Sequence, residues 1–402
     1  RGTASRAATS RGPAVQLVVS TDRLELAGKQ ARTGNPDGTV TLGPAPWRSS
    51  GVDGEIELTL AEGDGRTRVA ANLRDAHGPL VRADVTATLP LAAIWQSPEG
   101  ALGLLRNTPV EARLSVPRRS LDELPAGLGS VPLRGEVELT AGLTGTALSP
   151  RLTLTAKGSN LIPRTAAACV TGTEVKTAIA YDGRKAEVEI AASRDGSAIL
   201  AGTAKVDLDL AQAMSGEAPA WRASADVGLT RFPLDTTGAL LSQPISGNVS
   251  GKIALRDLHH AGALEADLKL DGLTLDHTAI PSGEVHLRMK EGALEGSARL
   301  DQSDGYAEAG IRGQMSWGAA VVPEVDFSKP MELHLQARNF RANAAAPFVE
   351  SVLSDLDGRI DADARFHVAP GGKDGRMSGS VTLREGVVVV PQIGERFHAI
   401  RG

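Results

Sequence analysis

Apolar and polar residues alternate along almost the whole chain, and this alternation constrains the fold more than any other feature of the sequence. Representative runs are residues 55–60, 136–139, 151–155, 205–210 and 267–270. Because successive side chains of a strand point to opposite faces, such runs predict strands with one apolar and one polar face. Helical periodicity is confined to four short segments, 91–105, 120–128, 236–242 and 344–353. The sequence therefore predicts an all-β protein with few short helices.

Pairs of aspartate and glycine separate many of these runs and predict tight turns. The pairs lie at 182–183, 195–196, 271–272, 304–305 and 374–375. Glycine readily adopts the positive φ that a two-residue hairpin turn requires, and aspartate tolerates it. The pattern indicates antiparallel strands joined by hairpins.

Several landmarks recur in the same order along the chain and predict an internal repeat of roughly 110 residues. The clearest is a glycine that opens a strand between two apolar residues, at Gly135, Gly247 and Gly358, with spacings of 112 and 111 residues. We predict the following organisation: the end of a preceding repeat in 1–50, repeat 1 in 51–160, repeat 2 in 161–275 and repeat 3 in 276–390.

A sheet with one apolar face must cover that face, and the expected helices are too few and too short to do so. The sheet can instead fold over on itself or coil into a solenoid, and either form grows in one dimension. Only 3% of the residues are aromatic, so the apolar face consists mostly of Val, Leu, Ile and Ala. We expect an elongated, repeat-built antiparallel sheet folded over an aliphatic groove. Such walls suit acyl chains, which bind through dispersion and exclusion from water.

The alternation also identifies the side chains that would line this groove. They are Ile56, Leu58, Leu60, Val137, Leu139, Leu152, Leu154, Val175, Ile179, Val206, Leu208, Val249, Ile253, Leu255, Leu268, Leu270, Val285, Leu287, Met289, Leu333, Leu335, Ile360, Val381 and Leu383. The alternative is that these residues pack against one another as a dry core, as protein interiors normally do.

Other kinds of chemistry find little support in the sequence. The net charge of −5 is spread over mixed acidic and basic residues, and the few aromatic residues argue against base-stacking nucleic-acid modules. Cys169 is the single cysteine, and the pair His259–His260 has no third ligand at a supporting spacing. Nucleophile and phosphate-binding motifs are absent from the sequence. We therefore expect no enzymatic activity, no metal site and no cofactor.

Residues 340–397 carry a resemblance to a known family. They contain the short helical segment 344–353 and the strand start Leu-Asp-Gly-Arg-Ile at 356–360. A strand from Gly379, a Glu-Gly pair at 385–386, the apolar run to Pro391 and a Gly-x-x-Phe sequence at 394–397 follow. This order is similar to the start of the C-terminal domain of TamB, the translocation and assembly module subunit, so 340–402 resembles that start. The remaining repeats resemble the wider TamB and AsmA-like family of bacterial envelope proteins.

The resemblance implies a U-shaped "β-taco" in the periplasm of a Gram-negative bacterium, anchored to the inner membrane. Members of the family are thought to carry phospholipid between the inner and outer membranes and to support outer-membrane biogenesis. TamB also partners an Omp85-type barrel. We expect Arg1 and Gly402 to lie inside a longer polypeptide, whose missing N-terminal region holds the membrane anchor and whose missing C-terminal region meets the barrel.

The expected function is a bridge-like conduit for phospholipid acyl chains, with no nucleic-acid partner. Two alternatives belong to other classes. The chain could be a scaffold or chaperone for the assembly or secretion of outer-membrane proteins, which would add strands to its exposed edges. It could also be a surface adhesin made of sandwich repeats, each with its own closed core.

Overall fold

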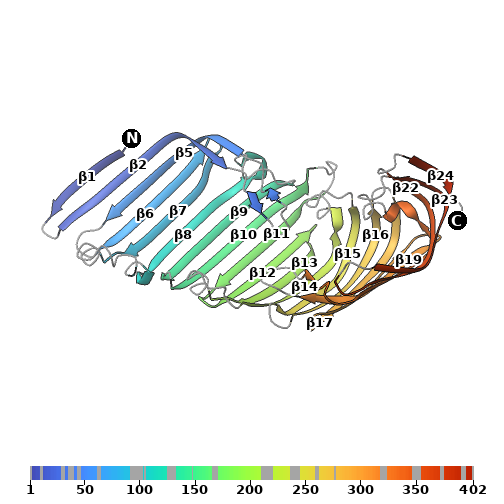
Figure 1. Ribbon diagram of the computed structural model, residues 1–402. Helices are drawn as coiled ribbons and strands as arrows, with labels where there is room; N and C mark the ends of the chain where they lie inside the picture. Colours follow the sequence, from blue (N-terminus) through green and yellow to red (C-terminus); the bar gives the residue numbers. More distant parts are fainter. Residues whose placement is uncertain are drawn as a thin grey trace. The chain divides into compact units, whose positions relative to one another are not determined.

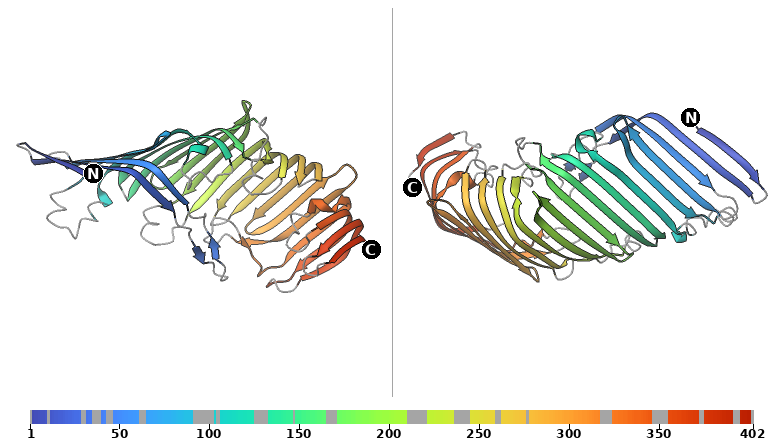
Figure 2. Two further views of the ribbon diagram at one scale, coloured as in Figure 1. Left: turned by 90° about the horizontal axis from the view of Figure 1, so that it is seen from above. Right: turned by 180° about the vertical axis from the view of Figure 1, so that it is seen from behind.

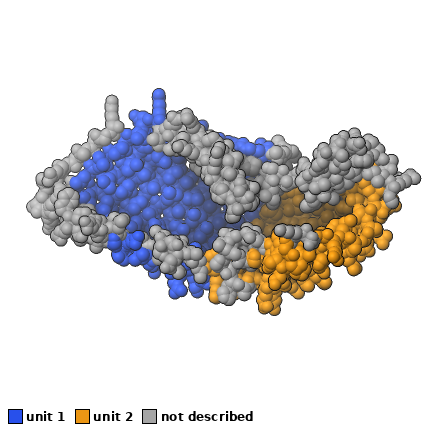
Figure 3. Space-filling view, in the orientation of Figure 1, with its two compact units in different colours: residues 1–196, 207–219 blue, residues 197–206, 220–402 orange. Residues whose placement is uncertain are grey.

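The computed structural model describes most of the chain. The described residues are 2–9, 12–28, 32–34, 40–42, 47–60, 65–90, 103, 106–124, 133–146, 148–164, 171–209, 221–235, 245–258, 262–275, 278–316, 324–345, 355–371, 375–390 and 395–400. The chain divides into two compact units (Figure 3): unit 1 comprises residues 1–196 and 207–219, and unit 2 comprises residues 197–206 and 220–402.

Unit 1 consists almost wholly of strands (Figure 1). They are β1 (Gly2–Thr9), β2 (Gly12–Gly28), β3 (Arg32–Gly34), β4 (Val40–Leu42), β5 (Trp47–Leu60), β6 (Arg66–Asp75), β7 (Gly78–Thr88), β8 (Val110–Ser120), β9 (Leu133–Thr146), β10 (Ser149–Pro163), β11 (Thr173–Tyr181) and β12 (Lys185–Arg194). A 3-10 helix, η2 (Leu121–Glu123), follows β8.

Unit 2 likewise consists almost wholly of strands. Its strands are β13 (Ser197–Asp207), β14 (Arg222–Pro233), β15 (Ile245–Leu258), β16 (Ala263–Leu275), β17 (Thr278–Lys290), β18 (Ala293–Asp301), β19 (Tyr306–Ser316), β20 (Glu324–Val325), β21 (Met331–Arg341), β22 (Asp355–Val368), β23 (Gly375–Val390) and β24 (Glu395–Ile400). A 3-10 helix, η3 (Ala342–Ala345), follows β21.

Neighbours in sequence are neighbours in the sheet of each unit, and every described pairing is antiparallel. In unit 1, β1, β2 and β5 to β12 pair in chain order, while β3 and β4 pair only with each other. In unit 2, β14 to β19 and β21 to β24 pair in chain order, and β20 adds to the end of β19. The expected all-β antiparallel architecture is confirmed.

The aspartate-glycine pairs behave in two different ways. In the hairpin between β11 and β12, Asp182 Oδ1 accepts hydrogen bonds from the backbone N–H groups of Arg184 and Lys185 at 2.9 and 2.7 Å. The pair at 271–272, in contrast, lies inside β16, where Gly272 has a φ of 58° and the register with β15 shifts. This pair therefore forms a β-bulge and not the predicted turn, because a positive φ serves either geometry.

The three glycines that mark the predicted repeats share one backbone conformation. The φ angles of Gly135, Gly247 and Gly358 are 136°, 122° and 115°. A Cβ at these positions would lie 2.6–2.8 Å from backbone atoms of the neighbouring strand, where the register shifts at a bulge. The recurrence therefore has a physical cause, since only glycine fits a positive φ against a crossing backbone. The repeat boundaries themselves stay a prediction.

The sheet of unit 2 curls, as the bending of β16 to β23 in Figures 1 and 2 shows. Buried apolar residues at the ends of β16 and β17 share one cluster with residues of β21 and β22; its members are Leu273, Leu275, Ile280, Ala337, Phe340 and Ala362. In the sheet, β18 and β19 lie between β17 and β21. Residues of β16 and β17 can therefore contact those of β21 and β22 only if the apolar face is on the inside of the curl. The surface of unit 2 is hollowed in Figure 3.

The short helices predicted from sequence lie mostly outside the described residues. Residues 121–123 of the predicted helix 120–128 form η2, and 125–128 are not described. At 344–353 only the end of η3 is described, while 236–242 and most of 91–105 are not described. Among the described residues, no helix has the length and apolar character needed to cross a membrane.

Candidate functional site

The candidate site is the apolar face of each sheet, and strand register brings its predicted lining residues into rows. One row of unit 1 crosses eight strands, from β5 to β12. It runs Ile56, Ala71, Ala83, Leu114, Ala141, Leu154, Ile179, Val188, each residue opposite the next. A parallel row passes through Leu58 and Leu152. The other predicted residues of unit 1, namely Leu60, Val137, Leu139 and Val175, lie on the same face.

In unit 2 the predicted residues form equivalent rows. The central row runs Leu268, Val285, Ala298, Ala309, Leu335, Ala364, Gly379, from β16 to β23. Its neighbour begins at Leu270 and ends at Val381. The same face carries Val249, Ile253, Leu255, Leu287, Met289, Leu333, Ile360 and Leu383. Val206 lies near the end of β13 and Leu208 just after it, both half-buried.

On β16 and β17 of unit 2, burial is greatest at the two margins of the apolar face. On β17, Ile280 is 0% and Met289 is 1% exposed, while Val285 and Leu287 between them are half-buried. The neighbouring β16 repeats the pattern, with Leu268 and Leu270 half-buried between buried residues on both sides. We call the half-buried row Leu268, Val285, Ala298, Ala309 and Leu335 the apolar band of unit 2. A close-packed interior would bury this row as completely as the margins.

Among the described residues, unit 1 has fewer buried apolar side chains than unit 2. Ile56, at the start of the row that crosses eight strands, is 48% exposed, and Leu114, in the middle of that row, is 39% exposed. In unit 2, comparable exposure is found on Leu333 and on Val381 and Met377 of β23. Of the predicted lining residues, only Val249 and Met289 are fully buried. The predicted set thus lies on one face in each unit, and most of its members keep some contact with solvent.

Small residues occupy the apolar face where the sheet of unit 2 bends. Ala337, Ala362 and Ala364 are buried on β21 and β22, and Gly379 follows on β23. Side chains on the inside of a bend converge, so only small ones fit without overpacking. Strands β18 and β19 carry the half-buried Ala298 and Ala309 in the band itself.

The opposite face of unit 2 carries charges of alternating sign across neighbouring strands. One row runs Glu265, Arg288, Glu295, Arg312, Glu332, His367, from β16 to β22. Within it, Arg288 bonds Glu265 at 2.8 Å and Arg312 approaches Glu295 at 3.6 Å. All these side chains are exposed, so each pair adds little stability. A one-residue register slip would turn the charged side chains of a strand to the apolar face, so the row favours one pairing of the strands.

A cavity of about 600 Å³ opens on this charged face and does not coincide with the apolar band. Its floor is formed around Ser297 and Gly310, and charged side chains such as His286, Arg288 and Arg312 surround it. Every one of these charged side chains has an opposite-charge neighbour within 4 Å. Each of its four carboxylates, from Glu265, Asp267, Glu295 and Glu332, thus lies beside a basic side chain.

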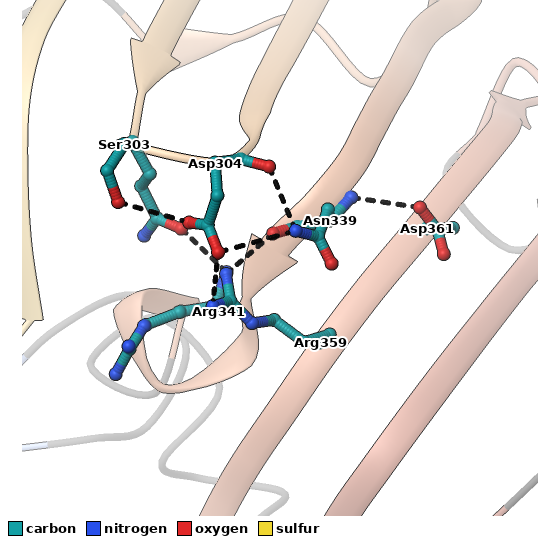
Figure 4. A network of polar contacts seen from close by, with 7 residues as sticks. Ser303, Asp304, Asn339, Arg341, Arg359 and Asp361 are labelled. Atoms are coloured by element: carbon teal, nitrogen blue, oxygen red, sulfur yellow. Dashed lines mark hydrogen bonds and ion pairs between the residues drawn. The ribbon is translucent and has the colours of Figure 1, made fainter.

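Polar networks hold the margins where strands begin and end. In unit 2, Arg359 bonds Asp304 at 2.5 Å, and the Asn339 side chain donates to the Asp304 carbonyl oxygen at 2.9 Å (Figure 4). The backbone N–H of Asn339, which has a positive φ at a bulge, donates to Asp361 at 2.9 Å. The hydrogen bond from Arg359 holds the pKa of Asp304 below its usual value.

Unit 1 has a more deeply buried counterpart at Arg119, near the end of β8. Arg119 is 6% exposed and bonds Asp75 at 2.5 Å and the Pro79 carbonyl oxygen at 3.1 Å. Burial of Asp75 opposes its ionisation, but the hydrogen bonds from Arg119 and from the His77 backbone N–H hold its pKa below the usual value. The guanidinium therefore fixes the turn between β6 and β7 against β8. Sequence reasoning missed this residue, since nothing distinguishes Arg119 from the exposed Arg118 beside it.

The described residues hold no group of three or more His, Cys, Asp or Glu side chains arranged to bind a metal ion. Cys169 and His259–His260 lie outside the described residues. Asp363 lies on the exposed polar face of β22, between the buried Ala362 and Ala364.

Comparison with known proteins gives no relative: no family model, no curated protein and no solved structure matches the chain.

Proposed function

We propose that this protein is a conduit for the acyl chains of phospholipids, which lie along the apolar face of its sheets. The observation that carries this proposal is the apolar band of unit 2, which stays half-buried and on β16 and β17 lies between buried residues on both sides. Hydrocarbon on the band would remove its aliphatic side chains from water, at roughly 25 cal/mol for each Å² covered. The rows that cross the strands offer a chain a path with few polar side chains.

The chemistry of the face favours movement over tight, specific binding. Val, Leu, Ile and Ala make dispersion contacts that depend little on the position of an acyl chain along a row. A lipid headgroup would stay at the margins, where the polar networks of Arg359 and Arg119 lie. We therefore infer a passive path in which hydrocarbon slides from one strand to the next.

The setting of this function follows from the resemblance of residues 340–397 to TamB. On that basis we propose a periplasmic location, inner-membrane anchoring of the full protein and a role in outer-membrane biogenesis with an Omp85-type barrel. The all-β, curled sheet of unit 2 is compatible with the U-shaped groove of that family.

Neighbouring residues on β18 supply a matched test. Ala298 lies in the apolar band, and Ser297 beside it lies on the polar face. Ala298→Asp places a charge on the hydrocarbon path, and Ser297→Asp places the same charge in water. We expect the phospholipid that co-purifies with the protein, measured by mass spectrometry, to fall at least several-fold in the first variant and to stay unchanged in the second.

A second measurement avoids any loss of folding. A photo-crosslinking residue at Leu335 should capture acyl chains, while the same residue at Gln336, directly after it, should not. Equal lipid capture at both positions, or no lipid at either, would refute the conduit. Capture of unfolded barrel polypeptides along a strand edge would support the scaffold function instead.

The structure offers no specific observation in favour of the adhesin. That alternative requires sandwich repeats with separately closed cores. The described strands of each unit instead pair in chain order within one layer.

A further inference from the structure

Histidines are distributed unevenly over the ion pairs that join strands in the described part of the chain. In unit 1 the cross-strand pairs Arg68–Asp84, Arg118–Glu136 and Lys157–Glu138 use Arg or Lys. In unit 2 three cross-strand pairs use histidine: His286–Asp267 at 2.7 Å, His334–Asp363 at 3.2 Å and His367–Glu332 at 3.7 Å. Arg and Lys keep their charge up to pH values well above neutrality, whereas histidine changes charge near it.

His286 has the strongest acidic surroundings of the three. Its Nδ1 lies 2.7 Å from Asp267 of β16, directly opposite in register, and its Nε2 lies 3.8 Å from Glu284 of its own strand. The hydrogen bond with Asp267 raises the pKa of His286 above its usual value. Ser297 is its uncharged partner on β18.

The other charged groups around His286 are already paired. Register places Glu265 and Lys269 of β16, Glu295 and Arg299 of β18, and Arg288 of its own strand on the same face. Arg288 bonds Glu265 at 2.8 Å, and Arg299 bonds Asp301 at 2.9 Å. Lys269 lies 4.0 Å from Glu284. His286 is thus the basic group in direct contact with Asp267, while Arg288 acts on Asp267 only through longer-range attraction.

The other two histidines face an arginine as well as a carboxylate. Arg365 of β22 is directly opposite His334, and Arg376 of β23 is directly opposite His367. Directly opposite His286, in contrast, lie the carboxylate of Asp267 and the uncharged Ser297, so no arginine faces its ring across the strands.

We infer that unit 2 carries a pH-dependent brace on its polar face, in which protonated His286 joins β17 to β16 through Asp267. Strands β16 and β17 also contribute Leu268 and Val285 to the apolar band and Ile280 to the buried margin. Acidification therefore strengthens the join between two strands that shape the band, and rising pH loosens it. This brace depends on ion pairs alone and holds whether or not the band carries lipid.

Fixed-charge variants of His286 test the brace. His286→Asn removes the charge at every pH, and His286→Lys keeps a positive charge at every pH. The measurement is amide hydrogen exchange of the β16–β17 hairpin in the whole chain, read by mass spectrometry at about pH 5.5 and about pH 8 and corrected for the intrinsic pH dependence of exchange.

At the lower pH we expect exchange in the Asn variant to be faster than in the wild type by about 1.5- to fivefold, the range for an exposed ion pair. At the higher pH the two should agree, and the Lys variant should be more protected than both. His77→Asn, in a turn of unit 1, should leave β16 and β17 unchanged at either pH. Equal rates for the wild type and the Asn variant at the lower pH, or the same difference at both pH values, would overturn the inference.

Discussion

The two units share a strand pattern and differ in what stabilises it. The apolar face of unit 1 exposes Ile56 and Leu114 in mid-sheet, and its margin is fixed by the buried Arg119–Asp75 pair. Unit 2 places Ile280 and Phe340 in one buried apolar cluster. The same alternating sequence can therefore lie open or curl over itself, and the difference arises where side chains meet across several strands. Both units have polar contacts at their margins, and the curled sheet of unit 2 adds a buried apolar cluster.

The largest expected effect separates a buried from an exposed ion pair within unit 1. Arg119→Met leaves the carboxylate of Asp75 largely buried without its partner, so we expect a loss of about 3 kcal/mol in the stability of unit 1. Arg118→Met removes an exposed pair with Glu136 and should change stability too little to measure. Chemical denaturation with hydrogen exchange of β6 to β8 measures both. Similar losses in the two variants would show that burial of the pair does not matter.

The repeated glycines should respond alike in both units, because their constraint is local. Gly135→Ala and Gly247→Ala each force an L-residue to a positive φ against a crossing backbone, and we expect about 2 kcal/mol lost in each case. Gly375→Ala, where an added Cβ meets nothing within 4 Å, is the matched control and should be neutral. A cost at only one of the two repeated glycines would contradict a shared bulge geometry.

One deleted methylene should distinguish the two apolar faces. Ile280→Val removes it from a fully buried site in unit 2, for an expected loss of about 1 kcal/mol. Ile56→Val removes it from the half-exposed face of unit 1, where solvent fills the space, and we expect almost no change in denaturation midpoint. Equal shifts would mean that the face of unit 1 is packed as tightly as the margin of unit 2.

The smallest expected effect is a difference in acid sensitivity. The folded-state pKa of Asp75 is depressed, so its contribution to stability is present above the unfolded pKa of about 3.9 and is lost as the pH falls through the folded value. The β6–β7 turn of unit 1 should therefore lose exchange protection below about pH 4. Asp75→Asn should remove this pH dependence in that turn and leave the response of β16–β17 near neutrality intact. An unchanged acid response in the variant would assign it to other carboxylates.

Residue patterns were sufficient for the all-β class, the antiparallel hairpins and the common face of the candidate lining residues. These features depend on side-chain direction along a strand, which alternates whatever the distant contacts are. The prediction at Asp271–Gly272 was wrong in detail, since the pair forms a bulge inside β16. The same residue types, aspartate and glycine, adopt a positive φ in a bulge and in a turn. Only the pairing with the neighbouring strand therefore distinguishes a bulge from a turn.

The polar contacts that stabilise the two units could not be predicted from sequence patterns. Arg118 and Arg119 are adjacent and chemically identical, yet one is exposed and the other is buried against Asp75. In the sequence, His286 is one polar residue among many in an alternating strand. Only the strand register shows that Asp267 lies directly opposite it. Partners of this kind are tens of residues or a whole hairpin away, and their meeting depends on strand pairing and bulge positions.

The sequence by itself determined which side of every strand is apolar, because the period of two is a property of the extended backbone. The tertiary structure alone decided how far that side is covered: the curl of unit 2 buries Ile280, whereas Ile56 of unit 1 stays open to solvent. Curvature accumulates from twist, bulges and small residues over many strands, so no local stretch of sequence contains it.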